Sequence, residues 1–174
     1  MIPRIIHQVW LGATDPEPPA DAAAAESWRA VHPEWSYRLW HGDEVEELFR
    51  TARPELLPRY RAYGHWVQRA DVARYLILYE HGGVYADHDV ACVGSFEPLR
   101  EAGAVLAPTR PFGVSNDLMA ARSGHPVMEA ALMGLPAAGE RWDRRWMLPY
   151  LRVLGSTGSL YLSGVLRRTR RVEV

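Results

Sequence analysis

Two aspartates separated by one residue form the pattern in this sequence best suited to binding a metal ion. Asp87 and Asp89 follow a short apolar, β-prone run at residues 84–86 (VYA). If that segment is extended, residues i and i+2 point the same way, so the two carboxylates aim at one point while His88 faces elsewhere. Converging carboxylates repel unless a cation lies between them, and oxygen ligands favour Mg²⁺ or Mn²⁺. A solvated loop is the alternative, but a charged pair in this apolar context needs a partner.

A second charged pair precedes the first, in a segment with helical spacing. Residues 66, 70, 73 and 77 are apolar and fall on one face of a helix, whereas Asp71 and Arg74 project side by side from another. Gly82 and Gly83 then stop the helix, because glycine takes the left-handed backbone of a C-cap without steric cost. Taken alone, the pair could be an ordinary ion pair within the helix, worth ~0.3–0.5 kcal/mol at a surface.

Alternating strand and helix patterns surround these residues and predict an α/β fold with a mostly parallel central sheet flanked by helices. Ligands in such folds bind beyond the carboxyl ends of strands, where Trp10 and the two aspartates are expected. A capping box of Asp43 and Glu46 is expected to open one helix. We expect strands at 2–11, 34–40, 84–86, 103–107 and 112–121 (broken at 115–117), helices at 21–31, 43–51, 54–63, 66–81, from 125 and after 156–159, and a strand that could begin at 172–174.

The stretch at residues 69–90, RADVARYLILYEHGGVYADHDV, resembles the DXD-containing glycosyltransferases of the sugar-binding-region family. The ordered string D-x-x-R-Y-x-x-L, then GG, then Y-x-D-x-D is far more specific than a lone DxD. The family includes initiating α-1,6-mannosyltransferases and inositol-phosphoceramide mannosyltransferases, and clostridial toxin glucosyltransferase domains look like more distant relatives. The resemblance implies the nucleotide-diphospho-sugar transferase fold of type A (GT-A). It also implies metal-dependent transfer of a hexose from a UDP- or GDP-sugar to an acceptor hydroxyl, generally with retention of configuration.

The same resemblance assigns roles to single residues. Asp87 and Asp89 would hold Mn²⁺ or Mg²⁺ against the donor diphosphate, where the cation screens the charge that develops as the glycosidic bond breaks. Asp71 would hydrogen-bond donor-sugar hydroxyls and Arg74 would touch the sugar or a phosphate. Tyr85 is assigned to the same substrate-binding group.

A further part of the resemblance is the signature IIHQVWLG, which contains Trp10. In relatives a tryptophan at this place, after the first strand, stacks on the nucleotide base. The alternative is a core position, because most tryptophans are largely buried and this chain has seven. We expect His7 to be buried in the strand rather than to bind a ligand.

Two later segments also match the family. The pattern SNDLMAARSGHP resembles the segment that lines the acceptor side, so Asn116 and Asp117 are candidates for transition-state stabilisation or acceptor contact. Ser-Asn-Asp is also a good turn sequence. Gly158 resembles the glycine of a Thr-Gly-Pro turn, although Ser159 replaces the proline. The arginines of residues 167–171 read as a solvated helix end, with phosphate or membrane binding as the alternative.

Composition fits one soluble domain spanning residues 1–174. The chain is 48% hydrophobic and 24% charged, and its net charge of -1 argues against nucleic acid as a partner and against a whole-molecule pull towards anionic membranes. The single cysteine, Cys92, excludes an internal disulfide. No secretory signal and no run of ~20 apolar residues is found. These features predict a cytoplasmic protein, which could be peripheral to a membrane.

Relatives usually continue past the point where this sequence stops, so the fold is expected to be short at its C-terminus. The expected consequence is an open donor site in which the protein holds the metal mainly through Asp87 and Asp89. Donor affinity would then be weak and turnover would lean towards hydrolysis. Residues such as His125 or Arg110 folded over the aspartates would contradict this expectation. A non-catalytic sugar-nucleotide binder and a nucleotide-sugar hydrolase are the alternative functions.

Overall fold

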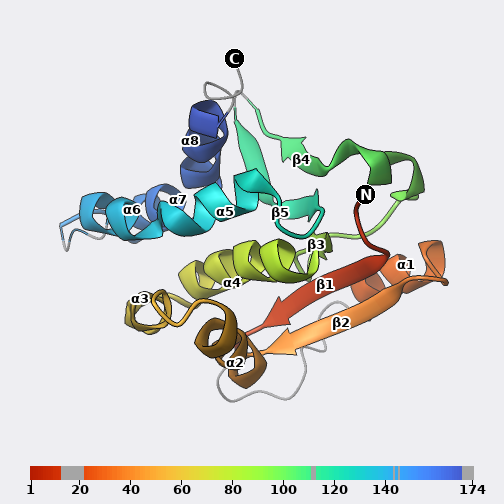
Figure 1. Ribbon diagram of the computed structural model, residues 1–174, viewed down its shortest axis with the longest axis horizontal. Coiled ribbons are helices and arrows are strands. Elements are labelled where there is room, and N and C mark those ends of the chain that lie inside the picture. Colours follow the sequence, from red (N-terminus) through yellow and green to blue (C-terminus); the bar gives the residue numbers. More distant parts are fainter. Residues whose placement is uncertain (13–21, 111–112, 143, 145, 170–174) are drawn as a thin grey trace.

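A five-stranded sheet with the order β2-β1-β3-β5-β4 forms the centre of the molecule (Figure 1). The computed structural model describes residues 1–12, 22–110, 113–142, 144 and 146–169. β1, β2 and β3 are parallel, and β5 is antiparallel to both of its neighbours, so β4 runs the same way as the first three. This is the mostly parallel sheet that the sequence predicts. The strands are β1 Ile5–Trp10, β2 Ser36–His41, β3 Gly83–Ala86, β4 Ala104–Pro108 and β5 Val114–Ala121.

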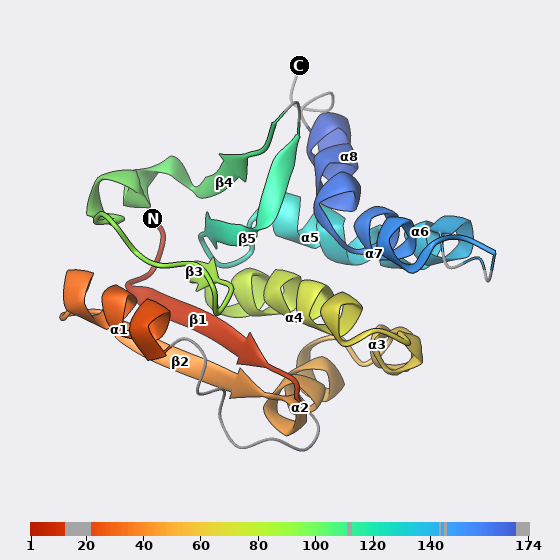
Figure 2. The same ribbon diagram turned by 180° about the vertical axis from the view of Figure 1, so that it is seen from behind.

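The helices divide unequally between the two faces of the sheet. α1 lies beside β1 and β2, whereas α5 to α8 gather next to β5 on the side where α4 lies (Figure 1, Figure 2). Alternation along β3 shows the two faces: Val84 packs with Trp28 of α1, and Tyr85 packs with the cluster around α4. The helices are α1 Ala22–Val31, α2 Gly42–Ala52, α3 Leu57–Ala62, α4 Trp66–His81, η2 Glu97–Ala102, α5 Pro126–Met133, α6 Leu135–Trp142, α7 Pro149–Ser156 and α8 Ser159–Thr169.

Two glycines connect α4 to β3 and so determine where β3 and Asp87 lie relative to α4. Gly82 and Gly83 have φ values of 66° and 100°, which confirms that glycines end the helix. A Cβ atom at Gly83 would lie 2.5 Å from the backbone oxygen of Ile5 in β1. Glycine is therefore needed both for the backbone conformation and for the close approach of β3 to β1. The short buried strand then carries the chain directly from the end of α4 to Asp87.

Three local predictions differ from the structure. Glu44, rather than Glu46, accepts the hydrogen bond at the start of α2, from the backbone N–H of His41 at 3.0 Å. α6 and α7 were not predicted, because each has only eight residues and a weak sequence pattern. β5 is continuous through residues 115–117, where a break was expected. The strand suggested at 172–174 and the beginning of the one predicted at 112–121 lie outside the described residues.

A bulge takes the place of the expected break in β5. Between the pairs Leu106–Met119 and Pro108–Val114, β4 advances two residues and β5 advances five, so three additional β5 residues must be accommodated. A bulge bends a strand and turns its side chains to new directions. Here it allows both Asn116 and Met119 to be buried, at an odd spacing that a regular strand would place on opposite faces.

Within the part of the chain that the structure describes, none of the helices combines the length and the apolar character needed to cross a membrane.

Candidate active site

A buried arginine joins α4 to the chain that follows β3. Arg74 is 4% exposed, and its Nη2 lies 3.4 Å from Oδ1 of Asp71 and 3.0 Å from Oδ1 of Asp87. Its Nη1 donates to Oδ2 of Asp87 at 3.2 Å and to the backbone oxygen of Asn116, and its guanidinium lies over the ring of Tyr85. Burial alone would lower the pKa of Arg74, but Tyr85 and the two carboxylates raise it, so the guanidinium stays charged.

Asp71 is equally buried and accepts hydrogen bonds on both oxygens. Nδ2 of Asn116 donates to Oδ1 at 2.7 Å, and Oγ1 of Thr157 donates to Oδ2 at 2.8 Å. Burial raises the pKa of Asp71, and this is opposed by Arg74 and by the Thr157 hydrogen bond. Asp71 and Arg74 thus lie side by side, and a surface ion pair is excluded because both side chains are buried. Their shared role in binding a donor stays a prediction.

Thr157 and Tyr75 also belong to this buried network, although neither was predicted from the sequence. Tyr75 donates from its hydroxyl to the backbone oxygen of Thr157 at 2.6 Å, and Nδ2 of Asn116 lies 3.4 Å from the same hydroxyl. These contacts anchor the turn between α7 and α8 to α4. A signal was present, because Tyr75 directly follows Arg74 in the D-x-x-R-Y string and Thr157 directly precedes Gly158.

The segment that carries the two aspartates is a turn, not an extended strand end. β3 ends at Ala86, and the N–H of Val90 donates to the backbone oxygen of Asp87 at 3.1 Å. The prediction that strand alternation aims both carboxylates at one point is therefore wrong in its geometry, because the turn replaces the pleat. A shared cation at Asp87 and Asp89 stays a prediction.

The two aspartates have different surroundings in this turn. The Asp87 side chain is 30% exposed, and its Oδ1 accepts a hydrogen bond from the Tyr85 hydroxyl at 2.6 Å. Asp89 is exposed. Asp117 lies opposite Asp87, whose N–H donates to the Asp117 backbone oxygen at 2.8 Å, and the Asp117 side chain is half-buried.

A cavity of about 440 Å³ lies beside the buried network. Five predicted site residues line it, namely Asp71, Arg74, Asp87, Asn116 and Gly158. Its remaining walls come from His65 and Val67 at the start of α4 and from Pro149, Tyr150, Val153 and Leu154 of α7 and Ser159 of α8. The charged side chains of Asp71, Arg74 and Asp87 form the floor of the cavity. Much of the remaining wall is apolar.

Trp10 lies beside the turn at residues 87–90, called the aspartate turn below because it carries Asp87 and Asp89, but does not line this cavity. Its half-buried indole makes an edge contact with the ring of His88, at 5.7 Å between centroids, and His88 Nε2 lies 2.9 Å from the backbone oxygen of Val9. A Cβ atom at Gly12 would lie 2.6 Å from the indole, so the chain passes close to it. Nε1 of Trp10 is buried and finds no hydrogen-bond acceptor among the described residues. A purely internal position for Trp10 is excluded.

Two residues whose closure over the aspartates would contradict an open site, His125 and Arg110, lie elsewhere. His125 caps the start of α5, where its Nδ1 accepts from the N–H of Val127 at 3.2 Å. Arg110 and Arg167 line a separate pocket of about 300 Å³ against α8. None of the three lines the cavity that contains Asp87, whose outer wall is α7.

Comparison with known proteins identifies the segment around this site. The family model for the "glycosyltransferase sugar-binding region containing DXD motif" matches residues 18–106, which include both charged pairs. Inositol phosphoceramide mannosyltransferase 3 of Schizosaccharomyces pombe is 37% identical over 171 residues, which cover 98% of this chain and 46% of that protein. The chain spans about half the length of the curated relatives it matches.

Solved structures share the fold at low sequence identity. The PaToxG glycosyltransferase superposes with a TM-score of 0.73 at 17% identity, over 97% of this chain and 70% of that one. The UDP-bound glycosyltransferase domain of the YGT toxin superposes with a TM-score of 0.72 at 9% identity, over 99% of this chain and 78% of that one. The chain therefore has the GT-A fold, as predicted.

Proposed function

Because the chain belongs to the family of glycosyltransferases whose sugar-binding region contains the DXD motif, we propose that it transfers a hexose from a nucleoside-diphosphate sugar to an acceptor hydroxyl. The donor is a UDP- or GDP-hexose. The name of the S. pombe relative favours mannose as the sugar and a lipid headgroup as the acceptor. The observation that carries the proposal is the buried chain of charges from Asp71 through Arg74 to Asp87 at the floor of a cavity. Buried charges are costly, and their clustering in a cleft is typical of functional sites.

The aspartate turn fits a divalent cation, Mn²⁺ or Mg²⁺. Tyr85 and Arg74 orient the Asp87 carboxylate, whose partial exposure leaves lone pairs available, and Asp89 is exposed in the same turn. Among the described residues there is no cluster of three or more His, Cys, Asp or Glu side chains that could hold a metal. The remaining ligands would therefore come from the donor diphosphate and water, as is usual for Mg²⁺. When bound, the cation screens the negative charge of the diphosphate.

The buried residues would bind and orient the donor sugar. Each Asp71 oxygen accepts one protein hydrogen bond, and a carboxylate oxygen has a second lone pair that can accept from a sugar hydroxyl. Asn116 and Thr157 hold that carboxylate in place, so little reorganisation is needed when the sugar binds. Arg74 keeps the floor of the cavity from carrying two uncompensated negative charges.

We infer retention of configuration from the family resemblance, and the carboxylates of the cavity bear on how it would occur. The carboxylates that line the cavity are Asp71 and Asp87, and both are paired with Arg74. A carboxylate in such a pair is a poor covalent nucleophile, so we infer attack from the front face, assisted by the departing phosphate. Asp117 is the remaining candidate near the turn, and it contacts Asp87 through its backbone.

A panel of UDP- and GDP-sugars with Mn²⁺ and a set of lipid and sugar acceptors tests the proposal. Release of nucleoside diphosphate that depends on both metal and acceptor is the expected result. Release without dependence on acceptor would indicate a nucleotide-sugar hydrolase. Thermal stabilisation by a donor with no turnover across the panel would indicate a non-catalytic binder and overturn the proposal.

A further inference from the structure

Large apolar side chains are exposed where α6 connects to α7 and at the start of α7. Trp146 is 81% exposed, Leu148 68%, Tyr150 73% and Leu151 43%. Single exposed apolar residues are normal on soluble proteins, but four large ones within six positions form a concentration that calls for a partner. Trp and Tyr among them are the side chains that prefer the interface between lipid and water.

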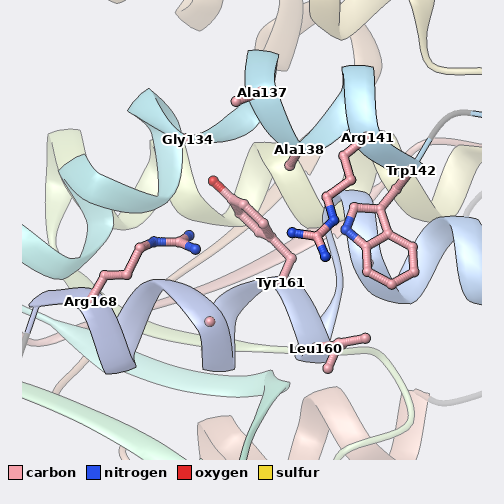
Figure 3. Close-up of a pocket in the computed structure, with 10 residues that line it drawn as sticks. Gly134, Ala137, Ala138, Arg141, Trp142, Leu160, Tyr161 and Arg168 are labelled. Atoms are coloured by element: carbon pink, nitrogen blue, oxygen red, sulfur yellow. The ribbon is translucent and has the colours of Figure 1, made fainter.

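Two arginines line a pocket that α6, α7 and α8 form together. Arg141 and Arg168 extend from α6 and α8 into a pocket of about 450 Å³, where they approach the ring of Tyr161 from two sides (Figure 3). Trp142 forms the end of the same pocket (Figure 3). Neither guanidinium forms an ion pair with a carboxylate in the described ranges of the chain. Two cations aimed into one opening favour an anionic group there.

A second pocket repeats this chemistry on the neighbouring side of α8. Arg110 and Arg167 line it, together with Tyr150 and Leu160. Leu160 is 44% exposed and lines both arginine pockets. Carboxylates are missing from the described linings of both pockets. Of the exposed apolar residues, Leu160 therefore borders both arginine-lined pockets and Tyr150 borders the second.

The charge of the whole chain is distributed in the same way. Residues 110–174 contain ten arginines and five acidic residues, whereas residues 1–109 contain ten arginines and sixteen acidic residues. The chain has no lysine, so all 20 of its basic residues are arginines. Arginine is weakly hydrated and binds phosphate through two parallel hydrogen bonds. The net charge of -1 is therefore unevenly distributed, because residues 110–174 carry an excess of positive charge.

We propose that this face, made of the α6–α7 connection, α7 and α8, docks on the surface of an anionic lipid bilayer. Trp146, Leu148 and Leu151 enter the interface, and the two arginine pockets receive lipid phosphates. Tyr150 lines both the cavity beside Asp87 and the Arg110–Arg167 pocket, so docking turns the mouth of the cavity towards the bilayer. Only this last point, the presentation of the cavity to a lipid acceptor, rests on the proposed function.

Co-sedimentation with vesicles tests the docking without any donor, acceptor or metal. We expect binding to phosphatidylcholine vesicles that contain about 30% phosphatidylserine, and little binding to phosphatidylcholine alone, because anionic lipids attract exposed basic side chains. The double variant Trp146→Ala/Leu148→Ala should lose at least about tenfold in vesicle affinity. Arg141→Gln and Arg168→Gln should each lose about fivefold, an effect that disappears at high salt.

Matched substitutions away from this face serve as controls. Val93→Ala/Leu99→Ala removes exposed apolar side chains, and Arg50→Gln removes an exposed arginine of α2, and both should bind vesicles like the unchanged protein. Equal binding by the Trp146→Ala/Leu148→Ala variant, or no binding of the unchanged protein to either vesicle, would overturn the proposal. A dimer in sedimentation analysis that this variant converts to monomer would assign the face to a second copy instead. Nucleotide affinity measured on the same variants should not change, which separates docking from the proposed activity.

Discussion

The guanidinium of Arg74, on α4, lies 3.0 Å from Oδ1 of Asp87, in the turn that follows β3. The same Nη2 lies 3.4 Å from Asp71, one helical turn earlier. Arg74 is therefore the common counterion of two aspartates that come from different elements. Arg74 both anchors the turn that carries Asp87 and offsets the charge of the buried Asp71 carboxylate, which are the two roles that the proposed metal and diphosphate site would need.

Arg74→Met should destabilise the protein strongly. The substitution leaves Asp71 buried without its cation and frees the Asp87 turn, and breaking a buried ion pair from one side costs roughly 3–5 kcal/mol. The measurement is the free energy of unfolding from denaturant titration. Arg50→Gln, which breaks an exposed i,i+3 pair with Glu47, is the control and should leave that free energy nearly unchanged. Equal stabilities for the two variants would mean that the Arg74 network is not formed.

Asp87→Asn and Asp89→Asn should both weaken metal-dependent donor binding, but only Asp87→Asn should lower the stability of the fold. Asp89 is exposed, so its substitution should abolish Mn²⁺-dependent donor binding while the free energy of unfolding is unchanged. Asp87→Asn should also weaken binding and in addition lose roughly 1–3 kcal/mol of stability, because its charge-assisted hydrogen bonds to Arg74 and Tyr85 are lost. Calorimetry with and without Mn²⁺ measures donor binding, and denaturant titration measures the free energy of unfolding. Donor binding by Asp89→Asn that still depends on Mn²⁺ would rule out the proposed metal site.

Local sequence patterns were sufficient to predict the elements that carry the charged floor. The helix α4, its two terminal glycines and the buried strand β3 each depend on nearby residues, through helical spacing and the conformational freedom of glycine. Asp71 and Arg74 could be placed together because they are three positions apart on one helix. Spacing along the chain thus predicted the parts of the site that one element holds.

The features that could not be predicted from the sequence depend on contacts between distant segments of the chain. The turn at Asp87 depends on pairing with Asp117, and the burial of Asn116 depends on a bulge set by the register of β4 against β5. Thr157 reaches Asp71 only because α7 and α8 pack beside α4. Strand alternation cannot predict a turn, and turn propensity at 115–117 was overridden by sheet pairing.

Trp10→Ala should affect ligand binding more than stability if the indole supports the nucleotide base. The side chain is half-buried beside His88, so its removal should cost less than the ~3–5 kcal/mol typical of a fully buried aromatic side chain. The affinity for UDP or GDP should fall in the same variant. Trp28→Ala is the matched control, because Trp28 of α1 is 1% exposed in the core against the sheet, and this variant should lose stability by the full amount. A Trp10 variant that is as unstable as the Trp28 variant and binds nucleotide normally would identify Trp10 as a structural residue.

His7 should make the stability of the protein depend on pH. Its Nδ1 accepts a hydrogen bond from Trp40 Nε1–H at 3.0 Å and its Nε2 lies 2.9 Å from the backbone oxygen of Gly82, so the neutral ring satisfies both contacts. Burial lowers the pKa of His7 from 6.5 to about 4, with His81 and Arg38 adding to the shift. The unfolded chain therefore binds more protons between these values, and stability should be full above about pH 6.5 and fall by about 3 kcal/mol as the pH drops to 4. Unfolding free energies measured across this range should show a shallower slope for His7→Gln, whose uncharged side chain does not titrate. The slope should not vanish, because burial also lowers the pKa of neighbouring His81, and an unchanged slope would show that His7 is not the titrating group.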